Sequence, residues 1–325
     1  MNGSIFEDLY IRGLLSEKSI NKVRAYQVKA ILSLFWELRT LLYLGIVMLS
    51  TGLGILVYKN IDTIGHQVIL LFIAAITTGC FYWCNKNKLP FSMGKVDAPD
   101  AFFDYFVLLG SLSFLTFTGY LQYQYEVFGS RYGLATFIPM LVLFFIAYYF
   151  DHRGILSLAI ANLAVWMGVT VTPKELIASA DFDDLTFIYT YLSLGCILLL
   201  AAYLTVEANF KKHFFFSYHH YGIHVTFIAL LCGYFYFEYA FSLAWLIVLL
   251  VLALFVYKQS FRNKSFYFLM VAVLYAYIAT GGFVVRSMIE MQGEDLWFFV
   301  FMYFVVSGIG LIMYLINANK EIKEQ

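Results

Sequence analysis

Apolar runs of membrane-spanning length follow one another along almost the whole chain. A helix needs about 20 apolar residues to cross the hydrocarbon core of a bilayer, which is about 30 Å thick. We place such runs at about residues 41–58, 67–83, 102–121, 132–150, 155–171, 185–206, 218–237, 240–257, 266–285 and 296–316. The sequence therefore predicts an all-α, polytopic integral membrane protein with about ten transmembrane helices.

The division between the seventh and eighth runs depends on one charged residue, Glu238. The stretch 223–257 is largely apolar and 35 residues long. A single helix of that length would measure about 52 Å at about 1.5 Å per residue, which is too long for one crossing. We therefore expect a tight turn at Glu238 and Tyr239.

Charged residues are too scarce for a soluble domain. They make up 13% of this chain, whereas about a quarter is usual. Hydrophobic residues make up 62% and the mean hydropathy is +0.77, so the lipid bilayer is the first predicted partner. The 21 basic and 21 acidic side chains balance, which gives no global attraction for nucleic acid, and we expect no such partner. The oligomeric state is not indicated.

The four cysteines, Cys80, Cys84, Cys196 and Cys232, lie inside or at the ends of apolar runs. This placement indicates buried thiols rather than the disulfide framework of a small secreted protein. The first thirty residues carry charges throughout, so no cleavable signal peptide is predicted. No phosphate-binding glycine loop, zinc-protease HExxH or nucleophile elbow is present, and we predict no cofactor and no enzymatic activity.

The distribution of basic residues predicts the orientation in the membrane. If the N-terminus is cytoplasmic, the outer connections hold only Lys59, Arg131, Lys174 and Arg286 of the 21 basic residues, which leaves 17 on the inner side. Cytoplasmic loops are enriched in Lys and Arg, and a miscounted span would reverse the bias downstream of the error. We therefore predict that the N-terminus and the C-terminus are both cytoplasmic.

Residues 1–38 have the pattern of a short cytosolic amphipathic helical hairpin. Ser4 and Glu7 form a capping box, Gly13 is placed to end the first helix, and Ser16 can cap the second. After it we expect the first six spans at 39–206, a histidine- and aromatic-rich inner connection at 207–222, the remaining spans at 223–316 and a cytosolic tail at 317–325. No segment is long enough for a separate soluble domain.

Histidines at helical spacing form the first candidate site. His213, His220 and His224 are separated by seven and four residues, so on a continuous helix they share one face. Neutral imidazoles one turn apart can chelate a transition metal, and ionisable groups at membrane depth are functional-site hypotheses, including proton sites. The alternative is that these histidines, set among phenylalanines and tyrosines, anchor the chain at the membrane interface.

Two further polar residues interrupt the apolar segments. Asn162 lies near the middle of the fifth run, where it can form an interhelical hydrogen bond or contact a substrate. Glu238 is either a solvated turn residue or a buried carboxylate whose pKa is raised by desolvation, which would suit proton coupling.

The N-terminal sequence LYIRGLLSEKSINKVRAYQ, followed by YLGIVMLSTGLGILVYKNID, resembles a family of predicted bacterial membrane proteins, domain of unknown function 2157. The resembling features are the turn at Gly13, Leu14, Leu15 and Ser16 and the tripeptide Asn60–Ile61–Asp62 after a glycine-bearing first span. Ile61 departs from the aromatic residue expected at the centre of that tripeptide. The resemblance covers about sixty residues. It implies a multi-pass protein of the bacterial cytoplasmic (inner) membrane and supplies no activity.

Three functional classes remain at this level. The first is a structural or regulatory membrane protein whose hairpin, residues 1–38, binds a cytosolic protein. The second is a transporter of a small or lipophilic solute through the helix bundle, and the third is a metal-dependent membrane enzyme. The third would gain support if the fold placed His152 beside His213 and His220.

Overall fold

The fold was analysed in a computed structural model, which describes residues 9–21, 34–59, 65–129, 132–171, 185–237, 239–290 and 296–324. These residues are helical apart from short connections, and none of them forms a strand. Beyond the N-terminal hairpin the helices are α3 (Leu34–Lys59), α5 (His66–Asn87), α6 (Ala101–Tyr125), α7 (Gly133–Tyr149), α8 (Arg153–Val171), α10 (Leu185–Glu207), the 3₁₀ turn η1 (Lys212–Phe214), α11 (Phe215–Tyr236), α12 (Tyr239–Arg262), α13 (Phe266–Glu290) and α14 (Leu296–Glu324).

Seven of the described helices, α5, α6, α8, α10, α12, α13 and α14, are long and apolar enough to cross a membrane. The apolar helix α7 and the apolar part of α3, Thr40–Leu56, are shorter. Helix α11 has 22 residues, but its three histidines lower its hydropathy. The prediction of an all-α protein with several membrane-capable helices is therefore confirmed.

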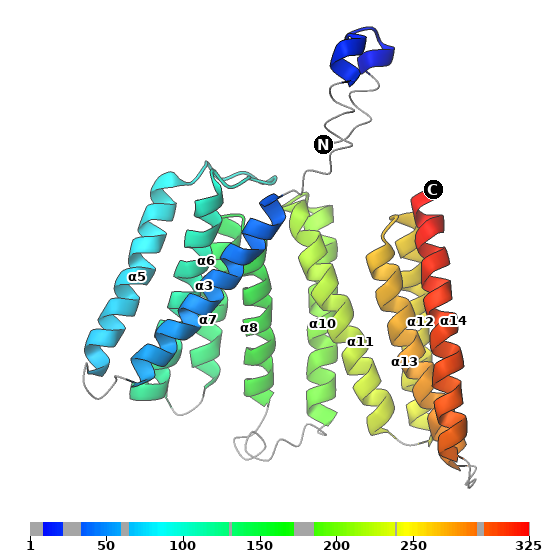
Figure 1. Ribbon diagram of the computed structural model, residues 1–325. Helices are drawn as coiled ribbons and strands as arrows, with labels where there is room; N and C mark the ends of the chain where they lie inside the picture. The colour runs from blue at the N-terminus through cyan, green and yellow to red at the C-terminus, as the bar shows by residue number, and fades with distance from the viewer. Residues whose placement is uncertain are drawn as a thin grey trace.

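The helices run up and down, and most pack against their neighbours in the chain (Figure 1). The start of α3 and the end of α14 lie at the same end of the bundle (Figure 1). The α5–α6, α7–α8 and α10–α11 connections meet at this end, which we call the basic end because Lys88, Lys95 and Lys211 lie there.

Two clusters of buried apolar side chains form the core. The first joins helices α5 to α8 with α10 and the start of α11, and includes Val107, Leu143 and Leu194. The second joins α11, α12 and α13, and includes Phe227 and Leu249. Helix α11 contributes to both clusters and therefore connects the two halves of the bundle.

Glycines bring α10 and α11 into close contact. A Cβ atom added to Gly195 would lie 2.2 Å from Thr226 Oγ1 and 2.9 Å from the Thr226 backbone nitrogen. A Cβ atom on Gly222 would lie 3.0 Å from the backbone nitrogen of Leu199. Small residues allow two helix backbones to approach each other, so these glycines set the α10–α11 spacing.

The described part of the hairpin has the expected turn. Gly13 has a positive φ of 73°, and the Leu14 backbone N–H donates to the Leu9 carbonyl at 3.0 Å. Ser16 Oγ accepts from the Ser19 backbone N–H at 3.3 Å and caps the following helix. Gly13 and Ser16 therefore have the geometry predicted from the sequence, whereas the capping box of Ser4 and Glu7 lies outside the described residues.

Two predicted connections are helical in the structure. Residues 215–222, which we assigned to the inner connection 207–222, form the first two turns of α11, so this connection is short. Residues 317–324, assigned to the tail, continue α14. Ala318 and Ile322 are buried there and cluster with Leu269, so apolar contact with α13 extends this helix beyond the predicted span.

Candidate functional site

A buried carboxylate, Asp151, organises the basic end of the bundle. It follows the C-terminus of α7 in the left-handed conformation, with φ 58°, which Asp tolerates better than most residues. Its Oδ2 accepts from the Val96 backbone N–H at 2.5 Å and from Lys211 Nζ at 2.9 Å. Its Oδ1 bonds to His213 Nε2. One side chain therefore joins the α5–α6, α7–α8 and α10–α11 connections.

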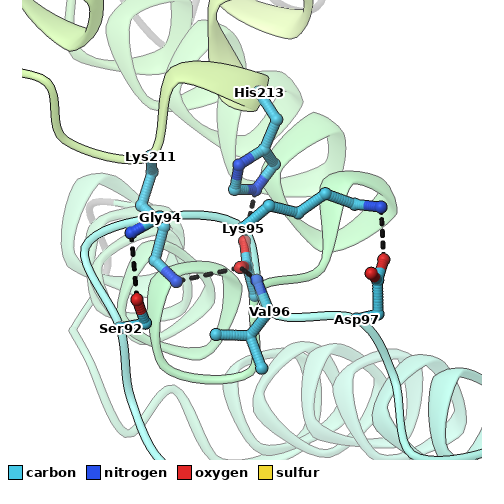
Figure 2. A network of polar contacts seen from close by, with 8 residues as sticks. Ser92, Gly94, Lys95, Val96, Asp97, Lys211 and His213 are labelled. Atoms are coloured by element: carbon cyan, nitrogen blue, oxygen red, sulfur yellow. Dashed lines mark hydrogen bonds and ion pairs between the residues drawn. The ribbon is translucent and has the colours of Figure 1, made fainter.

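Lys211 is buried together with this carboxylate. The side chains of Lys211 and Asp151 are 1% and 2% exposed. The Lys211 backbone N–H donates to the Met93 carbonyl at 2.8 Å, and its ammonium lies 4.8 Å from the centre of the Phe91 ring. Figure 2 shows Lys211 and His213 directed toward the loop that carries Gly94 and Val96. A charge at this depth requires a counter-charge, and Asp151 supplies it.

Opposing influences act on the pKa of His213. Burial, the largest influence, lowers the pKa, and so do the nearby charges of Arg153 and Lys211, whereas Asp151 raises it; the pKa therefore lies below the ordinary value of 6.5. The imidazole is therefore neutral at pH 7, and its Nε2–H donates to Asp151. The cluster then contains one negative and one positive charge, which balance.

Little free space remains in the cluster. The cavity beside Phe91, Val96, Phe103, Asp151 and Lys211 has a volume of about 10 Å³. That is room for about one water molecule. The arrangement fits a closed polar junction between three connections, and it leaves no room for a substrate.

His152, the neighbour of Asp151, has a different role. Its Nδ1 accepts from the Ile155 backbone N–H at 3.1 Å and caps α8, and its Nε2 lies 3.9 Å from Asp104 Oδ1. His213 bonds to Asp151 instead. His152 beside both His213 and His220, the placement from which the enzyme hypothesis would gain support, stays a prediction.

His220 and His224 lie together on α11, with ring centres 4.8 Å apart. They contact two tyrosines of α13: Tyr267 Oη lies 2.6 Å from His220 Nδ1 and 2.8 Å from His224 Nε2, and Tyr275 Oη lies 2.9 Å from His224 Nδ1. His213 lies on η1 and bonds to Asp151, so it does not take part in this chain of contacts.

The described residues contain no group of three His, Cys, Asp or Glu side chains arranged to hold a metal ion. The structure therefore separates His213 from the His220–His224 pair. Metal binding by these histidines stays a prediction.

The other predicted polar residues have simpler surroundings. Asn162 Nδ2 donates to the Leu158 carbonyl of its own helix at 3.2 Å. This hydrogen bond lies within α8, and the interhelical hydrogen bond or substrate contact of Asn162 stays a prediction. Glu238 lies outside the described residues.

Sequence reasoning missed Asp151, Lys211, Tyr267 and Tyr275. Asp151 carried a usable signal, since it stands in the charged triplet Asp151–His152–Arg153 between two apolar runs. The tyrosines carried none, because tyrosine is frequent throughout this chain, with 26 in all.

Comparison with known protein families gives a match for the N-terminal part of the chain. Residues 7–156 match a family model described as predicted membrane protein, DUF2157. Comparisons with curated proteins and with solved structures found no match. The family match extends well beyond the sixty residues that carry the resemblance, through the hairpin, α3 to α7 and the Asp151 turn. The resemblance to this family is thereby confirmed: residues 7–156, just under half of the chain, match the DUF2157 model of predicted membrane proteins.

Proposed function

We propose that this is a structural or regulatory protein of the bacterial inner membrane whose N-terminal hairpin binds a cytosolic protein. In this proposal the chain crosses the membrane ten times, with the basic end and both termini in the cytoplasm. The bias of 17 of 21 basic residues toward one side supports this orientation.

Exposed apolar side chains on the hairpin carry the proposal. Ile11 is 81% exposed and Leu14 is 71% exposed, on either side of the turn at Gly13. The turn is fixed by the hydrogen bonds of Leu14 and Ser16 described above. A partner with an apolar groove would bury both side chains, and each would contribute about 1.5–3 kcal/mol.

The Asp151 junction supports a structural role for the basic end. Asp151 and Lys211 tie three connections of the basic end together and leave no opening between them.

Photo-crosslinking in native membranes tests this function. We would place a photoreactive amino acid at Ile11 or Leu14 of the full-length protein, with Leu89 as the matched control. Leu89 is also an exposed aliphatic residue of the basic end. The proposal expects the same protein adduct from positions 11 and 14 and none from position 89.

Purified partner then gives the affinity. Ile11→Asp combined with Leu14→Asp should weaken its binding at least about 100-fold, which corresponds to about 3 kcal/mol. Adducts with lipid alone would show that the hairpin lies on the membrane surface, and unchanged binding by the double variant would refute the proposed contact.

A second candidate, transport of a lipophilic solute, is supported by a groove between α13 and α14. This groove has a volume of about 360 Å³ and includes Ala276, Thr280, Ser307 and Gly310. A Cβ atom added to Gly310 would have no neighbour within 4 Å, so the groove is unfilled at this point. The groove is shallow and open to the surface of the bundle, so a lipophilic solute would lie along α13 and α14 rather than be enclosed.

Liposomes containing the purified protein test this candidate with a short-chain fluorescent lipid. Gly310→Leu should fill the groove and abolish protein-dependent movement of the probe. Gly119→Leu is the matched control, because Gly119 also has open space at its Cβ but lies on α6. No movement above that of protein-free liposomes, or equal movement in both variants, would remove transport through this groove.

A further inference from the structure

Four side chains on α11 and α13 form an uninterrupted chain of hydrogen bonds. In order they are His220, Tyr267, His224 and Tyr275. The contacts are His220 Nδ1 to Tyr267 Oη at 2.6 Å, Tyr267 Oη to His224 Nε2 at 2.8 Å, and His224 Nδ1 to Tyr275 Oη at 2.9 Å. His224 uses both ring nitrogens, and Tyr267 has a histidine on each side.

The donors and acceptors of these groups allow two arrangements of the protons along the chain. A hydroxyl has one proton to donate, and a neutral imidazole has one N–H and one acceptor nitrogen. If Tyr267 donates to His220 Nδ1, it accepts from His224 Nε2–H, and His224 Nδ1 then accepts from Tyr275. If Tyr267 donates to His224 Nε2, it accepts from His220 Nδ1–H, and His224 Nδ1–H donates to Tyr275. Both arrangements satisfy all three contacts.

Moving one proton converts one arrangement into the other. A proton from water binds His220 Nε2 while His220 Nδ1 passes its proton to Tyr267. Tyr267 passes its own proton to His224 Nε2, and His224 Nδ1 passes its proton to Tyr275. Tyr275 releases its own proton to a water molecule, which the proposal places beside it in the middle of the bundle. One proton enters, one leaves, and every group ends neutral. Rotation of the hydroxyls and a tautomer change at each histidine reset the chain.

The chain runs from the basic end toward the middle of the bundle. Tyr267 lies in the first turn of α13 and Tyr275 eight residues later, which is about 12 Å along the helix. This covers less than half of a hydrocarbon core of about 30 Å. Within the described part of the chain, no hydrogen bond continues beyond Tyr275 Oη.

The surrounding titratable groups are few. Tyr221 of α11 interacts electrostatically with Tyr267, and His219 packs between Phe215 and Phe268. Positive charge lies at the basic ends of α12 and α13, at Lys258, Arg262 and Lys264.

We propose that His220, Tyr267, His224 and Tyr275 form a proton relay between the basic end and the middle of the bundle. Tyr267 is the central link, since it bonds to both histidines. That the relay opens to the cytoplasm rests on the orientation proposed above, whereas the relay itself rests only on the contacts.

A relay and a simple packing contact differ in the histidine tautomers. In the relay, His220 and His224 carry their protons on the same nitrogen, both Nδ1–H or both Nε2–H, and change together because Tyr267 couples them. A packing contact keeps a single arrangement at every pH and temperature.

Nitrogen NMR of the full-length protein in lipid nanodiscs separates the two cases. Histidine is labelled with ¹⁵N in the ring, and His220→Gln and His224→Gln assign the two signals. We expect both tautomers to be populated, in the same proportion at His220 and His224, and both proportions to change together as the temperature is varied. Tyr267→Phe keeps the ring but removes the hydroxyl, and it should abolish this correlation.

Tyr277→Phe is the matched control. Tyr277 lies on the same helix and bonds to Ser307 at 2.9 Å, outside the relay. This variant should preserve the correlated tautomers, and circular dichroism should show that both variants fold. A single tautomer at each histidine throughout, or a correlation that persists in Tyr267→Phe, would overturn the relay. The result is independent of hairpin binding, so it tests the relay separately from the proposed function.

Discussion

Asp151→Asn isolates the negative charge at the centre of the basic end. Asparagine has the same size, tolerates the same left-handed backbone and keeps an oxygen for the Val96 N–H. The change therefore leaves the turn intact and removes the counter-charge of Lys211, whose side chain is only 1% exposed.

The expected loss of unfolding free energy is about 3–5 kcal/mol, the range for removing one partner of a buried ion pair. Asp151 also bonds to His213 and Val96, so we expect the loss of unfolding free energy to lie in this range rather than near the small value of a surface ion pair. Lys211→Met combined with Asp151→Asn removes both charges and should recover part of the loss, because no uncompensated charge stays buried.

Unfolding of the purified protein in mixed micelles, followed by far-ultraviolet circular dichroism across a denaturant series, measures this free energy. Asp97→Asn is the control, since Asp97 pairs with Lys95 at the surface, and it should leave the unfolding curve unchanged. The reasoning fails if Asp151→Asn also leaves the curve unchanged, or if the double variant is as unstable as the sum of its two single changes.

Three further predictions address other contacts. Burial lowers the pKa of His213 below 6.5 in the folded protein, so at mildly acidic pH the unfolded chain binds more protons than the folded one. The contribution of His213 to the unfolding free energy should therefore be fully present above pH 6.5 and be lost as the pH falls through the folded pKa. His213→Gln should remove this part of the pH dependence of unfolding. Gln122 accepts from the Phe128 N–H at 3.0 Å, so Gln122→Ala should lower the unfolding free energy by about 1–3 kcal/mol, measured in the same assay. In Gly195→Ala the added methyl group overlaps Thr226, so the unfolding free energy should fall by about 1–3 kcal/mol and the melting temperature should fall with it. An unchanged melting temperature would contradict the close α10–α11 contact.

The chain's own sequence determined its class and its local structure. Apolar run length reports whether a helix can cross a bilayer, and it depends on neighbouring residues only. The turn at Gly13 and the cap at Ser16 are likewise local, and both have the predicted geometry. Helix ends were predicted less well where tertiary contact extends the helix, as at Ala318 and Ile322 of α14.

Tertiary structure decided which polar side chains meet. Asp151 and Lys211 are 60 residues apart in sequence, and His220 and Tyr267 are 47 apart. Helical spacing placed His213 with His220 and His224, but the short turn η1 and the nearby carboxylate direct His213 to Asp151 instead. Spacing in the sequence shows which side chains share one face of a helix. Which residue of another helix they contact is decided only by packing, such as the packing of α13 beside α11.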